Sequence, residues 1–308
     1  MMKKVMAIIG PTAVGKTALS IQLAQKFNGE VISGDSMQVY RGLDIGTAKV
    51  TAEEKQDVPH YLIDIKEPNE RYSVADFVTS AEALIDEITA RGHLPMIVGG
   101  TGFYLKALLY DMTLGGDKYE PSETVRRKWH QFAEANGQQA LWDHLAGIDP
   151  EAAQKIPVSN ERRVVRALEV YERTGILFSQ QQSGTQLRYD PLIIGLNTDR
   201  ALLYQRINQR VDQMLDEGLE NEARQLFDAG GEQFAAGKGI GYREFFPYFN
   251  LQQTLPDTVA QIKQDTRHYA KRQLTWFRHQ VPVTWFDIVQ HPEQLPAIRE
   301  TVSQWLQN

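Results

Sequence analysis

The sequence contains no cysteine among its 308 residues. Disulfide bonds, thiolate zinc sites and cysteine nucleophiles are therefore excluded. Long hydrophobic runs are also missing, and none approaches the roughly 20 apolar residues that a membrane-spanning helix needs. The apolar stretch that follows the first lysines ends early, at Gly10-Pro11. We expect a cytoplasmic protein with no membrane association.

Basic residues are fewer than acidic ones, and the formal net charge is -6. Lysine and arginine supply most of the affinity for phosphate backbones, so the total charge argues mildly against a nucleic-acid partner. Local clusters of arginine must carry any such function. The histidines are scattered without a metal-ligand spacing such as H-E-x-x-H. Hydrophobic residues at 42% and charged residues at 23% are typical of a soluble globular chain.

Short apolar runs alternate with helical patterns in the first third of the chain. Strands are predicted at 5–9, 31–32, 61–65 and 94–98, and helices at 17–27 and 75–89. This alternation predicts an α/β fold with a parallel sheet flanked by helices.

The pattern changes after the first third, where helical periodicity continues with no convincing strand. Helices are predicted at 126–135, 138–145, 150–154 and 161–173. A strand-like run returns at 191–196, and long helical patterns follow at 200–227 and 258–278. We therefore expect a core at 1–115, an all-helical insertion at 116–189, and a mostly helical return to the core at 190–308. The glycine-rich stretches 230–231 and 235–241 are predicted to be mobile loops.

A phosphate-binding loop lies between the first predicted strand and helix. Its sequence GPTAVGKT matches the pattern G-x-x-x-x-G-K-S/T at every specified position. Backbone amides and a helix N-terminus attract phosphate, the lysine adds a charge, and the hydroxyl of Thr17 is a candidate Mg²⁺ ligand. A fortuitous glycine-rich turn is the alternative, and the pattern leaves open whose phosphates are bound. The predicted phosphate-site residues are Gly10, Pro11, Thr12, Ala13, Val14, Gly15, Lys16 and Thr17.

Asp35 follows the second predicted strand. Because the carboxyl ends of parallel strands meet at one edge of a sheet, Asp35 is expected near Lys16. A carboxylate there can act as a general base or orient a nucleophile. An Asp-Ser turn or a helix cap explains the residue equally well.

A second glycine-rich loop, 98–102, ends the strand at 94–98. Strand-to-helix turns often need glycine for conformational reasons alone. An ordinary phosphoryl-transfer enzyme would favour an aspartate here to hold magnesium, and two glycines stand in that place.

Arginines cluster on two predicted helices. Arg162, Arg163 and Arg166 share the helix at 161–173 with three glutamates, so this helix either follows a phosphate backbone or is an ion-paired, solvated surface. Arg206 and Arg210 lie four residues apart on the next long helix. They either reach the phosphate loop or form a plain surface pair.

Taken together, six blocks resemble the tRNA dimethylallyltransferases: GPTAVGKT, DSMQVYRGLDIGTAK, GGTGFYL, RVVRALEV, IGYR and TRHYAKRQLTWFR. They run through nearly the whole chain in the family's order. One departure is minor, since Val50 stands where the family often has proline. The zinc-binding extension of some eukaryotic members is absent, which fits the bacterial type.

The resemblance implies a P-loop NTPase-like core that binds dimethylallyl diphosphate, and a helical insertion that clamps the anticodon stem-loop of tRNA. The prenyl group would move to N6 of adenine 37, with release of pyrophosphate and with Mg²⁺ as cofactor. By resemblance, Asp35 accepts the N6 proton, Thr101 lies near the base, and Lys16 and Arg210 stabilise the leaving group. The tRNA-binding residues implied in the same way are Asp35, Ser36, Met37, Gln38, Thr101, Arg126, Arg162, Arg163, Arg166, Lys238, Gly239, Ile240, Gly241, Tyr242 and Arg243.

Two other functions share some of these features. A small-molecule or nucleotide kinase has the same phosphate loop and core, and transfer from ATP would distinguish it. A non-catalytic RNA-binding module would bind an anticodon stem-loop without forming product. No protein partner is implied, and we expect a monomer.

Overall fold

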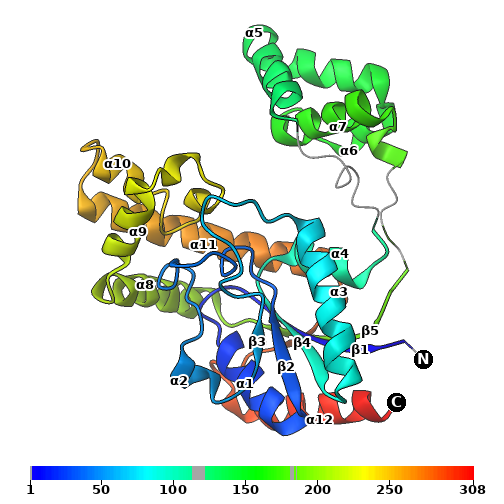
Figure 1. Cartoon of the computed structure of the whole chain (residues 1–308), viewed down its shortest axis with the longest axis vertical. Coiled ribbons are helices and arrows are strands. Elements are labelled where there is room, and N and C mark those ends of the chain that lie inside the picture. Colours follow the sequence, from blue (N-terminus) through cyan, green and yellow to red (C-terminus); the bar gives the residue numbers. More distant parts are fainter. Residues whose placement is uncertain (1, 113–121, 181–183, 185) are drawn as a thin grey trace. The chain divides into compact units, whose positions relative to one another are not determined.

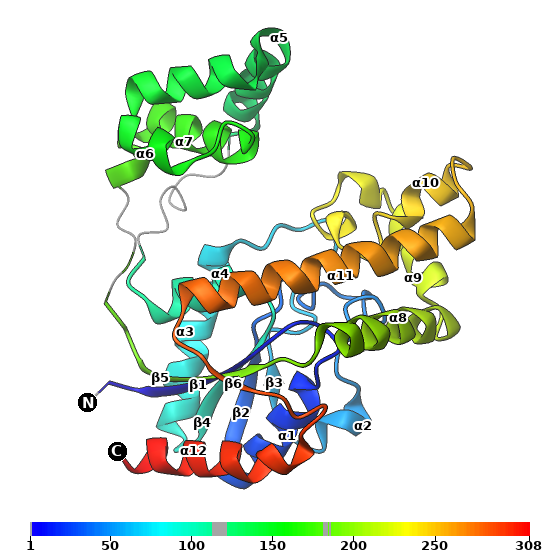
Figure 2. The ribbon, with the colours of Figure 1, turned by 180° about the vertical axis from the view of Figure 1, so that it is seen from behind.

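The core of the protein is a six-stranded parallel sheet. The computed structural model describes residues 2–112, 122–180, 184 and 186–308. Within these residues the strand order is β3-β2-β4-β1-β5-β6 (Figure 1; β6 is labelled in Figure 2). The strands are β1 Lys4–Ile9, β2 Gly29–Ser33, β3 His60–Tyr61, β4 Leu94–Gly99, β5 Asp190–Leu196 and β6 Thr284–Phe286. In register, Met6 of β1 is paired with Met96 of β4 and with Leu192 of β5.

Helices cover both faces of the sheet, which explains why its central strands are apolar throughout rather than alternating. On one face, α1 (Lys16–Phe27) and α12 (Leu295–Gln307) pack against β1, β4 and β5 through Leu23, Ile298 and Val302. On the other, α3 (Val74–Ala90) lies along β2 and β4 (Figure 2). The remaining core elements are α2 Ala52–Lys55, α4 Gly102–Leu109, α8 Arg200–Asp216, α9 Leu219–Asp228, α10 Phe245–Phe249 and α11 Leu255–Gln280, with 3₁₀ turns at Gly231–Gln233, Ala236–Lys238 and Pro292–Gln294.

A second unit, Tyr110–Leu187, is separate from the core unit Met1–Leu109 with Arg188–Asn308. It holds α5 (Glu123–Ile148), α6 (Pro150–Lys155) and α7 (Glu161–Thr174), followed by a 3₁₀ turn at Phe178–Gln180. These helices enclose their own apolar cluster, which includes Trp129, Leu141 and Leu168. Gly137 has φ 87° and kinks α5 between the two helices that the sequence predicts there. The unit begins six residues and ends two residues before the expected boundaries.

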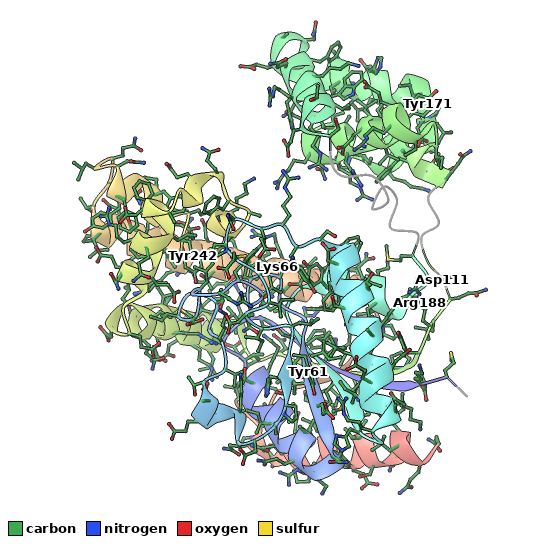
Figure 3. All side chains as sticks on the ribbon, viewed as in Figure 1. Tyr61, Lys66, Asp111, Tyr171, Arg188 and Tyr242 are labelled. Carbon is green, nitrogen blue, oxygen red and sulfur yellow. The ribbon has the colours of Figure 1, made fainter. Side chains whose placement is uncertain are left out.

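The chain leaves the core and returns to it at neighbouring points. The N–H of Arg188 donates to the carbonyl of Leu109 at 2.9 Å, and Asp111 N–H donates to Gln186 at 3.0 Å. Tyr110 and Leu187 form an antiparallel bridge between these two bonds, and Figure 3 labels the next residues, Asp111 and Arg188. The helical unit is thus inserted into a single connection, between α4 and β5.

Several local predictions are wrong. The helix expected at 200–227 is two helices, because Gly218 with φ 105° separates α8 from α9. The stretch 235–241, expected to be mobile, is tightly packed: a Cβ on Gly237 would lie 1.9 Å from the carbonyl oxygen of Gly231. The periodicity does not predict β6, and β3 is shorter than expected. None of the described helices is long and apolar enough to cross a lipid bilayer.

Candidate active site

The phosphate loop, residues 10–17, connects β1 to α1 with a backbone that requires glycine at two positions. Gly10 has φ 148°, and a Cβ there would lie 2.5 Å from the carbonyl oxygen of Leu196. Gly15 has φ 97° and precedes the first residue of α1. The unpaired N–H groups of the first helical turn therefore face the loop and favour an anion.

Lys16 folds back over this loop. Its Nζ donates to the carbonyls of Gly10 at 3.0 Å and Pro11 at 2.7 Å. Burial and, to a smaller extent, the nearby Arg210 lower the pKa of Lys16 to about 8, although the charge of Asp35 opposes both. The ammonium is thus partly buried among the carbonyls of the loop, where its charge acts more strongly on a bound phosphate than it would in bulk water.

The hydroxyl of Thr17 makes no side-chain hydrogen bond to another described residue. It lies at the start of α1, beside Lys16, and is available as a metal ligand. Within the described residues, no group of three or more His, Asp or Glu side chains is arranged to hold a metal. Mg²⁺ commonly takes one or two protein oxygens and completes its shell with water and substrate phosphates, so this sparse donor set fits Mg²⁺ bound together with a diphosphate.

Asp35 lies beside the phosphate loop, as predicted. Its Oδ1 accepts the N–H of Met37 at 2.9 Å, which is the local turn that the alternative interpretation required. Burial raises the pKa of Asp35, while hydrogen bonds from the backbone and the charges of Lys16 and Arg210 lower it in part. The two interpretations are compatible: the turn places a carboxylate of enhanced basicity next to two cations.

The second glycine-rich loop brings Thr101 to the same place. The Thr101 hydroxyl accepts the Ser36 N–H at 3.2 Å and donates to the Ser36 hydroxyl at 3.4 Å. Tyr269 of α11 also hydrogen-bonds to Thr101. This loop packs closely against α11. The Gln273 amide nitrogen donates to the carbonyl of Gly100 at 3.0 Å, and a Cβ on Gly100 would lie 2.1 Å from that nitrogen.

Arg206 and Arg210 of α8 reach the phosphate loop, so the alternative of a plain surface pair is wrong. Arg206 donates to the carbonyl of Ala13 at 2.8 Å. Arg210 acts on Lys16 and Asp35 through its charge, and burial lowers its own pKa. Arg206 is not among the site residues that the resemblance implies, but its spacing from Arg210 had left contact with the phosphate loop as one of two interpretations, and the structure supports that one.

The arginines predicted to contact RNA fall into two groups within the helical unit. Arg126 and Arg166 both bind the buried carboxylate of Glu169, at 3.0 and 2.8 Å. Arg162 and Arg163 are exposed and make no side-chain hydrogen bond or ion pair with another described residue. The structure therefore distinguishes two arginines that hold helices together from two that are open to a partner.

Among the residues implied to bind tRNA, most of the segment 238–243 is not exposed, and Gln38 is hydrogen-bonded inside the protein. Tyr242 is fully buried, and its hydroxyl donates to Glu222 at 2.7 Å. Lys238 and Arg243 are the exposed side chains of this segment, and Arg243 pairs with Glu244. The amide of Gln38 is bonded internally at both ends, which no sequence pattern indicates. Ser36 and Met37 are partly exposed.

The parallel sheet, the phosphate loop at the end of β1 and the carboxylate and arginines around it define a P-loop NTPase-like enzyme. The family model described as IPP transferase matches residues 38–280. The chain belongs to the IPP transferase family.

Relatives of known name are similar over the whole chain. A tRNA dimethylallyltransferase of Limosilactobacillus fermentum is 59% identical, with 99% of each chain covered, and one of Latilactobacillus sakei is 56% identical with the same coverage. The solved tRNA isopentenylpyrophosphate transferase of Bacillus halodurans is 48% identical, with 100% of this chain and 97% of that chain covered and a TM-score of 0.75. A eukaryotic dimethylallyltransferase described as acting on tRNA is 34% identical over 94% of this chain and 75% of that chain, with a TM-score of 0.77.

Proposed function

We propose that this protein transfers the dimethylallyl group of dimethylallyl diphosphate to N6 of adenine 37, beside the tRNA anticodon. The names of its relatives support the reaction. The observation that carries the proposal is that Asp35, Lys16 and Arg210 come together at the phosphate loop, close enough for their charges to interact. Such a site has one group to take a proton and two cations to receive a leaving diphosphate.

The donor half of the reaction takes place at the phosphate loop. The bond between the prenyl C1 and the diphosphate oxygen breaks, and the electron pair leaves with pyrophosphate. Lys16 and Arg210 bind the negative charge that grows on this group, in surroundings where preorganised charges act strongly. Mg²⁺ at the Thr17 hydroxyl would neutralise part of the same charge.

The acceptor half takes place at Asp35. N6 of the adenine forms its new bond to the prenyl C1, and Asp35 takes the proton that N6 loses. Thr101, which is fixed by Ser36 and Tyr269, would lie near the base. A base inside the anticodon loop must be turned out of its stack to reach this site, which costs a few kcal/mol that contacts with the rest of the RNA must offset.

The RNA would be held by cations outside the catalytic site. The exposed Arg162 and Arg163 are suited to phosphate contacts, because their charges have no internal partner among the described residues. Lys238 and Arg243 of the core unit would contact the same RNA. We further propose that the protein acts as a monomer in the cytoplasm, where tRNA is modified.

A kinase is the weaker alternative, because the place that a magnesium-binding aspartate would take is occupied by glycine. β4 ends at Gly99, where a Cβ would lie 2.4 Å from the backbone of Gly34. No side chain can be accommodated at this point without a shift of the backbone. The site therefore lacks a standard part of ATP-dependent phosphoryl transfer.

The test is incubation of the protein with dimethylallyl diphosphate, Mg²⁺ and an anticodon stem-loop RNA, followed by mass analysis of the nucleosides. We expect adenosine that carries one dimethylallyl group. Lys16→Ala should severely impair use of the donor with little change in RNA affinity, because it removes a charge-assisted hydrogen bond to the leaving group. Unmodified adenosine together with transfer from labelled ATP would instead establish the kinase.

A further inference from the structure

A buried carboxylate outside the catalytic site organises one of its loops. Glu222 of α9 is 8% exposed, and its Oε2 accepts the N–H groups of Asp44 at 2.7 Å and Ile45 at 2.9 Å. Its Oε1 accepts the N–H of Gly46 at 2.9 Å and the hydroxyl of Tyr242 at 2.7 Å. Three consecutive amides thus wrap one anion, as in the backbone nests that bind phosphate.

The fit around this carboxylate is close. A Cβ on Gly46 would lie 2.6 Å from the Tyr242 ring and 2.9 Å from Leu219. The loop therefore lies directly on the buried tyrosine, and four donors fill the acceptor positions of the carboxylate. Charge-assisted hydrogen bonds of this kind are about twice as strong as neutral ones.

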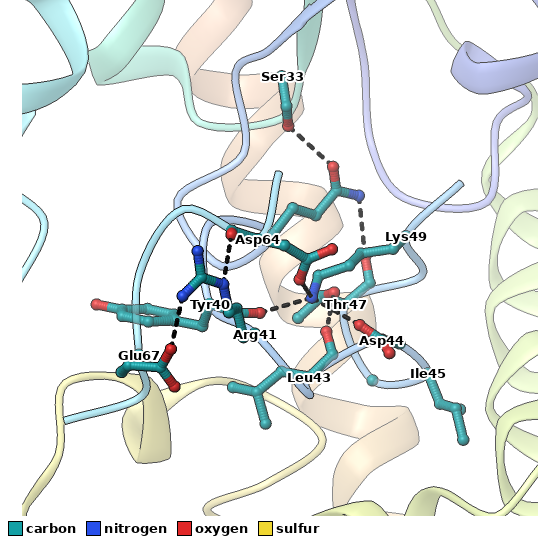
Figure 4. A network of polar contacts seen from close by, with 12 residues as sticks. Ser33, Tyr40, Arg41, Leu43, Asp44, Ile45, Thr47, Lys49, Asp64 and Glu67 are labelled. Carbon is teal, nitrogen blue, oxygen red and sulfur yellow. Dashed lines mark hydrogen bonds and ion pairs between the residues drawn. The ribbon is translucent and has the colours of Figure 1, made fainter. Parts of the chain in front are cut away.

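The loop held by Glu222 holds Gln38 in turn. The Gln38 amide nitrogen donates to the carbonyls of Thr47 at 3.2 Å and Ala48 at 3.3 Å. Its oxygen accepts the Ser33 hydroxyl at 2.9 Å, and that hydroxyl accepts the N–H of Asp35 at 3.4 Å. Figure 4 shows this network between Ser33 and the carbonyls of the loop. Glu222 is therefore linked to the backbone of Asp35 through the loop 44–48 and the hydrogen bonds that this loop makes with Glu222 and Gln38.

Lys49 secures the other side of the same loop. Its Nζ donates to the Tyr40 carbonyl at 2.5 Å and to Asp44 at 2.7 Å, and it also pairs with Asp64 (Figure 4). The lysine thus ties the loop to the segment around Asp64, while Glu222 ties it to α9. Between these two anchors the position of Gln38 is strongly restricted.

The geometry points to Glu222 as a positioning residue for prenyl transfer: through the amides of 44–46 and the amide of Gln38, it fixes the turn that carries Asp35. This inference rests on the function proposed above. General-base catalysis needs the carboxylate within hydrogen-bond reach of the proton it takes, and a displacement of about 1 Å can cost about 10² in rate. Glu222 touches neither the phosphate loop nor Thr101, so its effect should fall on the chemical step.

The test is single-turnover prenylation at saturating donor and RNA, with Glu222→Gln. The amide of glutamine turns one acceptor into a donor and opposes the N–H groups that face it. We expect a rate lower by roughly 10–100-fold, in keeping with a small misplacement of the base. The affinity for pyrophosphate, measured separately, should be unchanged. Glu222→Asp keeps the charge and should recover part of the rate, and it serves as the informative variant if Glu222→Gln does not fold.

The matched control is Glu30→Gln. Glu30 is also a buried carboxylate that accepts a tyrosine hydroxyl, from Tyr61 at 2.6 Å, but it lies at the start of β2, away from Asp35. This variant should lower the melting temperature and leave the single-turnover rate unchanged below it. Equal rates for Glu222→Gln and Glu30→Gln would overturn the inference, whereas absence of product with the unaltered protein would overturn the proposed function instead.

Discussion

At the scale of single residues, Asp35 shows that a structural and a chemical role can reside in one side chain. Its Oδ1 closes a turn with Met37, and the same turn directs the carboxyl toward Lys16 and Arg210. The turn is a local property, but the raised pKa arises from burial by elements far away in the sequence. Substitution by asparagine separates the two roles, because asparagine retains the acceptor for the turn and loses the basic group.

Asp35→Asn should lower the single-turnover rate of prenylation by roughly 10²–10⁴, the range of general acid–base catalysis. The melting temperature and pyrophosphate binding should change little. The reactive form of Asp35 is the carboxylate and its pKa is raised, so the rate of the unaltered protein should fall as the pH is lowered, beginning at a higher pH than for an ordinary aspartate. The residual rate of the variant should lack this fall. A rate within about threefold of the original would remove Asp35 from the mechanism.

At the scale of elements, α7 uses its arginines for two purposes. Glu169 is fully buried and joins α7 to α5, because it accepts Arg166 of its own helix, Arg126 of α5 and the N–H of Ser122. A buried charge of this kind must be paired, so the two arginines are required for the packing of the helices. Removal of either affects the stability of the unit as well as any binding of RNA. Arg162 and Arg163 are exposed and do not bind Glu169, so their substitution tests RNA binding without disturbing the packing of the helices.

Joint substitution of Arg162 and Arg163 by alanine should weaken binding of the anticodon stem-loop for all sequences. The slope of the logarithm of affinity against the logarithm of salt concentration should fall by about one for each phosphate that the protein no longer neutralises. The measurement is a titration of RNA binding at several salt concentrations. Lys155→Ala in the same unit is the control, because Lys155 is paired with Glu151 on the surface and should leave the slope unchanged. An unaltered slope in the double variant would show that these arginines are solvated surface residues that do not contact RNA phosphates.

At the scale of the whole molecule, the candidate catalytic residues all lie in one of the two units of the chain. The core unit carries the phosphate loop, Asp35 and Thr101, while the helical unit encloses a separate apolar cluster. The ends of the helical unit meet where Arg188 donates to Leu109 at 2.9 Å. This connection resembles a surface turn into which a domain has been inserted, and such positions tolerate large changes of length.

Replacement of residues 110–187 by a short glycine-containing turn should leave a core that folds cooperatively and still binds pyrophosphate. Binding should raise its melting temperature as it does for the full chain, since the ligand stabilises the folded state by mass action. Binding of the stem-loop RNA should weaken, and its salt dependence should decrease. A core that gains no stability from pyrophosphate would show that the phosphate site depends on the helical unit.

Features that depend on local backbone geometry could be predicted without the structure. The phosphate loop is one of them, because Gly10 and Gly15 adopt φ of 148° and 97° between a strand and a helix. The nearness of Asp35 to Lys16 followed from the common edge of parallel strands. The helices of the insertion were predicted from their periodicity, although the residues at which the unit begins and ends were not.

The choice of partner for each side chain, in contrast, is made by tertiary packing. Glu222 binds the amide of Gly46, which lies 176 positions earlier in the chain, and Arg206 binds Ala13 across 193 positions. Periodicity places such residues on a helix face but does not specify what packs against that face. The same limit applies to Arg162 and Arg166, which are alike in sequence and differ because only Arg166 lies near the buried Glu169. Burial and pairing set their roles, and both depend on how distant segments pack together.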